Sequence, residues 1–205
     1  MKSSTEEILP IPGTRMGGGF YAGRIRIDDK PFALIVAPKA DGEHDDSAWN
    51  GSIKDVTDAM SYFDGQANTL AMAKAGSKLA KWALDLRIDN LDDWYLPSQD
   101  ELEICYRNLK PGTAANWCYG RSGINLSALV PTYPYTPDLP VQTLAEAFQS
   151  GGREAFSLDW YWSSTQHASD SGCAWYQDFL YGFQDDSHKT GKFRARAVRR
   201  IYIED

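Results

Sequence analysis

The sequence predicts a mixed α+β fold with short antiparallel strands, two main helices and long loops. Short runs rich in β-branched and aromatic residues are typical of strands, and two segments place apolar residues at helical spacing. In addition, 17 glycines and 10 prolines favour many turns. No change in composition divides the chain, so we expect an irregular N-terminal arm over residues 1–19 and a single domain over residues 20–205.

The first regular structure is expected directly after the arm, in which prolines and three consecutive glycines discourage helix and strand. Residues 20–27 alternate in side-chain type and predict a strand. Residues 31–37 predict a second strand, and the two aspartates at 28–29 supply the turn of a hairpin. The unbroken apolar run in the second strand indicates burial on both faces.

Two helices are expected in the middle of the chain. The acidic stretch 38–52 indicates a loop, and residues 66–86 then carry apolar side chains at mostly helical spacing. Gly76 weakens this first helix by roughly 1 kcal/mol relative to alanine. The second helix covers residues 99–108 and is the sharper prediction, because its start carries a recognisable signal.

That signal is a capping box formed by Ser98 and Glu101. The serine hydroxyl accepts a hydrogen bond from the backbone of residue 101, while the glutamate reaches back to the backbone of Ser98. A short strand is expected to end just before it, at Leu96. The helix is expected to stop at Pro111-Gly112.

The remainder of the chain combines one long loop with several strands. Residues 112–140 contain four prolines and predict an irregular but packed loop, followed by a short helix over 141–149. Strands are expected at residues 161–165, 174–179 and 193–200, with polar loops at 166–172 and 180–190. Arginine alternates with apolar residues in the last strand, so we expect Arg194 and Arg196 to pair with nearby acids.

Composition excludes several classes of function. The net charge of −7 argues against nucleic acid and against anionic membrane surfaces as partners. The apolar runs are too short to span a bilayer, and the N-terminus has no apolar segment typical of a secretory signal. Three widely spaced cysteines indicate reduced thiols rather than a disulfide framework.

No motif for a metal, a cofactor or a catalytic nucleophile stands out. The acidic residues from Asp41 to Asp46 fail the calcium-loop pattern, because Ser52 occupies the position that needs an acid. No two of the three histidines have helical metal-ligand spacing. The serines at 163 and 164 lack a nucleophile elbow, and the glycines at 17–19 lack a phosphate-loop lysine. We expect neither catalysis, cofactor nor metal.

Aromatic residues concentrate between positions 160 and 183. Alternation along the strands places one set in the core: Trp162, Trp175 and Phe179. For a second set, burial and exposure remain equally open: Tyr176, Tyr181 and Phe183. Exposed tyrosine beside aspartate, glutamine and histidine is suited to binding a sugar or a protein.

Several motifs in the second half of the chain resemble a known family. They are the run Trp94–Leu102, the strand Tyr161–Thr165, an Ala-Trp strand at 174–175, a turn at Gly182, and a final Arg-Ala-Val-Arg strand at 196–199. Together they resemble a phage and bacterial family of domains of unknown function. This family is related to the C-terminal domain of collagen-like adhesins and belongs to the C-type-lectin-like superfamily. The resemblance covers roughly residues 90–202.

The resemblance implies a C-type-lectin-like fold for residues 20–205 and structural roles for the Trp94–Leu102 and Tyr161–Thr165 motifs. One group of relatives, the formylglycine-generating enzymes, uses a cysteine pair near the C-terminus, whereas this region holds Cys173 alone. The calcium-dependent sugar motifs of animal lectins are absent. In the variable receptor-binding proteins of phage retroelements, contacts come from the stretch that corresponds to residues 166–190.

The expected function is therefore that of a non-enzymatic phage virion surface protein, a tail adhesin or a capsid decoration, that binds a host cell-surface glycan or protein. Its ligand-binding residues are predicted to be Tyr176, Asp178, Tyr181, Phe183, Gln184, Asp185 and His188. The arm at 1–19 would dock to other virion proteins, after synthesis in the host cytoplasm. Two alternatives are a purely structural virion component and an enzyme of the formylglycine-generating type. The ligand, a homo-oligomer and calcium in the acidic loops remain open.

Overall fold

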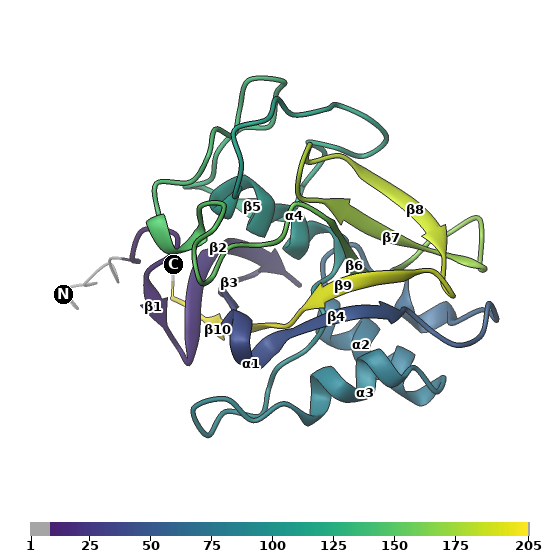
Figure 1. Ribbon diagram of the computed structural model, residues 1–205. Helices are drawn as coiled ribbons and strands as arrows, with labels where there is room; N and C mark the ends of the chain where they lie inside the picture. Colours follow the sequence, from purple (N-terminus) through teal and green to yellow (C-terminus); the bar gives the residue numbers. More distant parts are fainter. Residues whose placement is uncertain (1–8, 205) are drawn as a thin grey trace.

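The fold is mixed α+β, as the sequence predicts. The computed structural model describes residues 9–204. Two β-sheets lie side by side, and helix α4 (Gln99–Leu109) packs against strands of both (Figure 1). Helices α2 (Gly65–Lys74) and α3 (Lys78–Asp85) lie next to the second sheet, where α2 contacts β6 (Trp160–Gln166).

The first sheet joins the predicted N-terminal hairpin to the last strand of the chain. Its strands are β1 (Arg15–Met16), β2 (Gly19–Ile27), β3 (Lys30–Val36) and β10 (Val198–Tyr202), in that order, with β5 (Ala128–Leu129) paired to β2. Asp28 and Asp29 have positive φ angles of 49° and 60°, which a two-residue hairpin turn requires. The hairpin is confirmed. Residues 33–37 are fully buried, which confirms burial on both faces.

The second sheet contains the predicted strands at 161–165 and 174–179, and two further strands lie at its edges. The prediction of one strand over 193–200 is wrong, because the chain divides there: Lys192–Arg196 lies in this sheet, and the residues after Ala197 form β10 of the first sheet. The order of the second sheet is β4 (Glu43–Ala48), β9 (Lys192–Arg196), β6, β7 (Cys173–Asp178) and β8 (Gln184–His188). Strands β6 and β9 run parallel, and the other neighbours are antiparallel. The expected pairing of the strand arginines with acids is confirmed, because Arg194 contacts Asp45 and Arg196 contacts Glu154.

The prediction of loops over 38–52 and 180–190 is wrong in part, because the first range contains the edge strand β4 and the second contains the edge strand β8. Strand β4 follows the short helix α1 (Lys39–Gly42), and β8 follows the turn after β7. Both strands are rich in acidic residues, which local composition associates with loops. Their backbones instead pair with β9, far along the chain, and with β7, across a short turn, and this pairing overrides the local preference of the acidic residues.

The single helix predicted over 66–86 is also wrong, because the structure breaks it into α2 and α3. Gly76 has a φ of +92°, a conformation that glycine adopts readily, and Ser77 caps α3 by accepting a hydrogen bond from the Ala80 N–H. The 3₁₀ helix η1 (Thr57–Ala59) precedes α2. Gly76 therefore ends α2, and the next residue, Ser77, begins α3.

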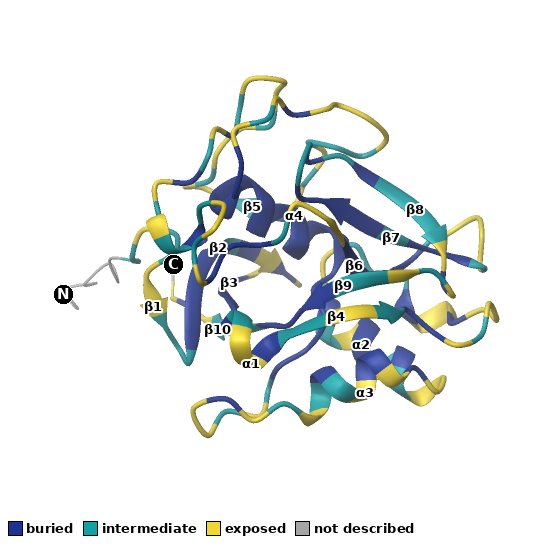
Figure 2. Cartoon of the chain, in the orientation of Figure 1, coloured by how far each residue is buried: buried dark blue, intermediate teal, exposed yellow. Residues whose placement is uncertain are grey.

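The capping box at the start of α4 is confirmed, with both of its hydrogen bonds present. Every residue of α4 is buried, as Figure 2 shows by its unbroken dark ribbon. The strand expected to end at Leu96 is reduced to a single bridge between Tyr95 and Val198. Burial of Trp162 and Phe179 is confirmed.

Between α4 and β6 the chain forms the predicted long loop. Within 112–140 the regular structure described is β5, and the helix expected over 141–149 is reduced to the 3₁₀ turn η2 (Glu146–Phe148). This loop is largely exposed in Figure 2. No helix in residues 9–204 is long and apolar enough to cross a bilayer.

The described part of the N-terminal arm, residues 9–19, lies against the domain. The Gly13 N–H donates to the Tyr21 carbonyl at 2.8 Å, and β1 pairs with the start of β2, so the expectation of wholly irregular structure is wrong here. Leu9 and Met16 pack against a buried cluster that includes Trp94. Residues 1–8 lie outside the described residues, and docking of the arm to a particle stays a prediction.

Candidate binding surface

Aromatic side chains from the second sheet and from the long loop form a continuous row, which we call the aromatic strip. Its members are Trp117, Trp160, Tyr176, Tyr181, Phe183 and Phe193. The ring centroids of successive neighbours lie 5.1 Å apart for Phe193–Tyr176, 5.0 Å for Trp160–Tyr176 and 6.2 Å for Tyr176–Phe183. The row continues through Phe183–Trp117 at 5.7 Å and Trp117–Tyr181 at 4.5 Å.

Strand pairing explains why these rings gather on one face. Tyr176 of β7 lies opposite Trp162 of β6 and opposite Asp185 of β8. Because side chains alternate along a strand, Phe183 and Asp185 share the face of Tyr176, and Trp160 lies one step along the same face of β6. The strip therefore follows from the register of three strands.

Trp117 forms the outermost layer of the strip. Its ring lies nearly parallel to that of Tyr181, at an interplanar angle of 13°, yet 54% of its surface remains exposed. The backbone N–H of Trp117 donates to the Tyr181 carbonyl at 2.8 Å, and the backbone carbonyl of Trp117 accepts a hydrogen bond from the Tyr135 hydroxyl at 2.7 Å. The backbone of Trp117 is thus fixed by hydrogen bonds, and one part of its flat ring is exposed to solvent.

The turn between β7 and β8 is fixed by Asp178. One carboxylate oxygen accepts hydrogen bonds from the Leu180 and Tyr181 N–H groups at 2.6 and 2.7 Å, and the other accepts from the Trp160 indole at 2.8 Å. Gly182 follows with a φ of +75°, and a Cβ there would lie 2.2 Å from the Tyr106 ring. Asp178 is buried, so we assign it a positioning role for Tyr181 and Trp160.

The structure divides the seven predicted ligand-binding residues. Tyr181, Phe183 and Asp185 are half-buried and lie at the strip. Two others are buried: Tyr176 is a member of the strip but only 6% exposed, and Asp178 lies beneath the strip. From the sequence, burial and exposure of Tyr176 are equally open, and the structure shows it buried. The predicted core position of Trp175 is wrong, because Trp175 is half-buried.

The remaining two predicted residues, Gln184 and His188, face the other side of β8. Gln184 is buried: its side-chain oxygen accepts from the side-chain amide of Gln99 of α4, and its own amide donates to the Gln99 backbone carbonyl, each at 3.1 Å. His188 is exposed at the far end of the strand, about 17 Å from Phe183 at an ordinary strand rise. The structure does not bring these two residues to the strip.

Sequence reasoning missed three members of the strip: Trp117, Trp160 and Phe193. Trp117 lies in the long loop far along the chain from β8, and only folding brings the two together. One signal was present, because Trp117 and the exposed Tyr119 lie two positions apart in the segment 112–123, whose other residues are small or polar. Paired exposed aromatic residues in a long loop are typical of binding segments.

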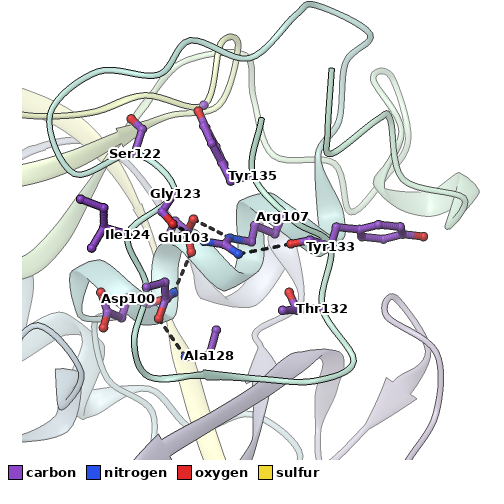
Figure 3. Close-up of polar contacts among 12 residues, drawn as sticks. Asp100, Glu103, Arg107, Ser122, Gly123, Ile124, Ala128, Thr132, Tyr133 and Tyr135 are labelled. Carbon is purple, nitrogen blue, oxygen red and sulfur yellow. Dashed lines mark hydrogen bonds and ion pairs between the residues drawn. The ribbon is translucent and has the colours of Figure 1, made fainter. Parts of the chain in front are cut away.

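The polar face of α4 holds the long loop in place (Figure 3). Arg107 donates to the carbonyls of Gly123 and Tyr133 at 3.1 and 3.3 Å, and its charge is balanced by Glu103 at 2.5 Å. Asp100 accepts from the Ser127 hydroxyl at 2.8 Å. Burial raises the pKa of both carboxyl groups, while hydrogen bonds and the arginines oppose that rise.

Two other features are weaker candidates for a site. Burial raises the pKa of the Cys173 thiol to about 12, so this thiol is protonated near neutral pH and is a poor nucleophile. A shallow hollow of about 380 Å³ at the end of α4 is lined by residues that include Pro137, Val141 and Lys110. The Lys110 amine already donates to Ala114, Asn116 and Pro140.

Metal binding finds no support in the described residues, where no group of three or more histidine, cysteine or acidic side chains is arranged to hold an ion. No protein-family model matches this chain, and no curated protein matches it. The aromatic strip is the strongest candidate for a binding site among the described residues. Its chemistry is that of stacking and hydrogen bonding.

Proposed function

We propose that this protein is a non-enzymatic binding domain that recognises a host cell-surface glycan through the aromatic strip. In keeping with the motif resemblance, it would act on the surface of a phage virion, as a tail adhesin or a capsid decoration. The residues proposed to touch the ligand are Trp117, Tyr181, Phe183 and Asp185, with Tyr119 at the margin.

The observation that carries the proposal is the exposed ring of Trp117 above Tyr181 and Phe183. Sugar rings present flat arrays of C–H groups that pack against aromatic faces, and their hydroxyl groups bond to nearby polar groups. Tyrosine and tryptophan supply both kinds of contact at low conformational cost. The backbone around Trp117 is already fixed, so binding would require little further ordering.

For the fold, we propose the C-type-lectin-like class within the observed α+β architecture. Two features of the motif resemblance support it. Trp94 and Leu96 of the first motif are buried beside α4, and residues 161–165 of the second motif are buried in the central strand β6. Buried motifs in these positions fit the structural roles that the resemblance implies.

The first test removes the outermost ring. We expect Trp117→Ala to weaken binding of the isolated protein to its glycan or to whole host cells at least about tenfold, because a stacked aromatic anchor is commonly worth 1.4 kcal/mol or more. The melting temperature should stay close to that of the wild type, since the ring is more than half exposed. Glycan-array and cell-binding measurements provide the readout.

The matched control is Tyr202→Ala, which removes an exposed aromatic side chain from β10, away from the strip. Undiminished binding by a well-folded Trp117→Ala protein would sink the proposal. A second variant, Tyr181→Ala with Phe183→Ala, removes the layer beneath Trp117 and should also abolish binding. A large loss of stability in that variant would instead assign Tyr181 and Phe183 to the core.

A second candidate is a structural virion component whose strip contacts only other virion subunits. The exposed apolar side chains of Leu126 and Val130 on the long loop favour protein contacts of some kind. Under this alternative the isolated protein binds no cells or glycans, but it co-purifies with particles. Trp117→Ala would then lower its incorporation into particles.

A further inference from the structure

The aromatic strip contains a second exposed ring, Trp160, which the proposed ligand contacts leave unused. Of its surface, 40% is accessible to solvent, compared with 54% for Trp117. Tyr176 lies between the two and is buried. The strip therefore presents two exposed aromatic rings to solvent, and a buried ring separates them.

The register of the second sheet sets the distance between these two rings. Strands β6, β7 and β8 lie side by side (Figure 1), and Trp160 pairs with Asp178, whose N–H in turn donates to the Phe183 carbonyl at 3.0 Å. Trp160 and Phe183 are thus separated by two strand spacings, or about 10 Å. Trp117 stacks on Phe183, with the ring centroids 5.7 Å apart. The strip consequently runs across the strands, from β6 to the long loop.

One buried carboxylate fixes the two rings relative to each other. Asp178 accepts from the Trp160 indole at 2.8 Å through one oxygen and from the Tyr181 N–H at 2.7 Å through the other. The Tyr181 ring in turn stacks on Trp117, with the ring centroids 4.5 Å apart. The spacing of the two exposed rings is therefore set before a ligand arrives, and a ligand that touches both would require little reordering of the protein.

The surroundings of Trp160 combine stacking surface with hydrogen-bond acceptors. The Phe193 ring meets Trp160 edge to face at 5.1 Å, and both rings contact Tyr176. The indole N–H is bonded to Asp178, so the exposed part of the Trp160 ring is apolar. Asp159, whose side chain is 52% exposed, supplies carboxylate oxygens next to it. An apolar ring beside polar acceptors is the same chemistry that favours a sugar at Trp117.

We infer that the aromatic strip binds an extended glycan chain that lies across strands β6, β7 and β8, with one sugar unit on Trp117 and another on Trp160. The inference rests on the proposed function and adds the length of the ligand to it. A single sugar ring is about as wide as one aromatic ring, so a terminal sugar covers only one of the two. When one chain touches both rings, the second contact adds affinity without the cost of a second association.

The experiment measures the affinity of the intact protein for glycans of different length by isothermal titration calorimetry. The probes are fragments of the surface polysaccharide of cells that the wild type binds, released by partial acid hydrolysis and separated by size. We expect the wild type to bind long fragments at least about tenfold more tightly than single sugar units. Trp160→Ala should remove this dependence on length, whereas Trp117→Ala should weaken binding at every length.

Trp160→Phe is the control for Trp160→Ala, because both variants lose the indole N–H that bonds to Asp178 but only phenylalanine keeps a ring for stacking. It should keep most of the dependence on length, and melting temperatures check that both variants fold.

A wild type whose affinity does not change with length would overturn the inference, and this measurement needs no variant. A folded Trp160→Ala protein that keeps the wild-type dependence would also overturn it, since longer fragments would then merely repeat one epitope. A wild type that binds no cells would instead refute the proposed function, on which the inference depends, so the two failures are distinguishable.

Discussion

Glu101 shows how one buried carboxyl group fixes the junction of two helices. It accepts hydrogen bonds from the Tyr95 hydroxyl at 2.6 Å, the Ser98 N–H at 2.7 Å and the Gly65 N–H at 3.1 Å. The first of these contacts orients the buried Tyr95, the second completes the capping box of α4, and the third holds the first residue of α2. Burial nevertheless raises the pKa of this carboxyl from 4.5 to about 7.

This raised pKa gives stability a pH dependence with a defined sign. The folded protein holds the Glu101 proton more tightly than the unfolded chain does. The stability that this proton contributes to the fold is therefore fully present below about pH 4.5 and is lost as pH rises towards 7. The loss amounts to about 3 kcal/mol. We expect Glu101→Gln, which keeps the shape and can still accept from both backbone N–H groups, to remove this loss.

The measurement is the free energy of unfolding by urea for the wild type and Glu101→Gln across this pH range. The difference should shift in favour of the variant by about 3 kcal/mol between about pH 4.5 and about pH 7. Asp46→Asn, at an exposed acid of β4, is the control and should show no such shift. A constant difference for Glu101→Gln would show that Glu101 is ionised throughout.

At the scale of elements, the break between α2 and α3 depends on Gly76. The Gly76 N–H donates to the Ala73 carbonyl and the Ser77 N–H donates to the Met72 carbonyl, each at 3.0 Å, so the last turn of α2 is closed by backbone bonds. This closure requires the positive φ of Gly76. Ser77 then restarts the helix in a new direction.

We expect Gly76→Ala to destabilise the protein by about 1 kcal/mol through backbone strain alone, because no atom lies within 4 Å of the added Cβ. Gly51→Ala is a matched control, because its Cβ is equally unobstructed and its φ lies outside the left-handed region. The control should stay within about 0.5 kcal/mol of the wild type in urea unfolding. Equal effects at both sites would contradict the helix-break argument.

Local signals predicted the elements whose cause is local. The Asp28-Asp29 turn and the Ser98–Glu101 capping box each require only neighbouring residues, and both are confirmed. The edge strand β4 escaped prediction because its partner β9 lies far along the chain. The edge strand β8 pairs with the neighbouring strand β7, but its polar and acidic residues carry no local strand signal. The same division applies to the aromatic strip, where Tyr181 and Phe183 were predicted from one stretch of sequence, whereas Trp117 meets them only after folding.

At the scale of the whole molecule, Arg196 connects the two sheets. It belongs to β9, yet its side chain donates to the Ala37 carbonyl just after β3 at 2.9 Å, across the junction between the sheets. It also donates to the carbonyl and the carboxylate of Glu154 at 2.6 and 3.1 Å. The guanidinium is fully buried and lies over the Phe156 ring, 4.9 Å from its centroid.

A buried charge with these contacts should be far more costly to remove than its half-buried neighbour Arg194 on the same strand. We expect Arg196→Met to cost about 3–5 kcal/mol, because Glu154 and the Ala37 carbonyl lose their buried partner. Arg194→Met should cost about 1 kcal/mol, since its partners Asp45 and Asp159 lie at the surface. Its third partner, the buried Glu43 side chain at 3.4 Å, keeps Lys39 and Arg196 within 3.6 and 3.8 Å. Urea unfolding of both variants measures the contrast. Equal costs would mean that the contacts of Arg196 contribute no more than a surface ion pair, and that apolar packing alone holds the two sheets together.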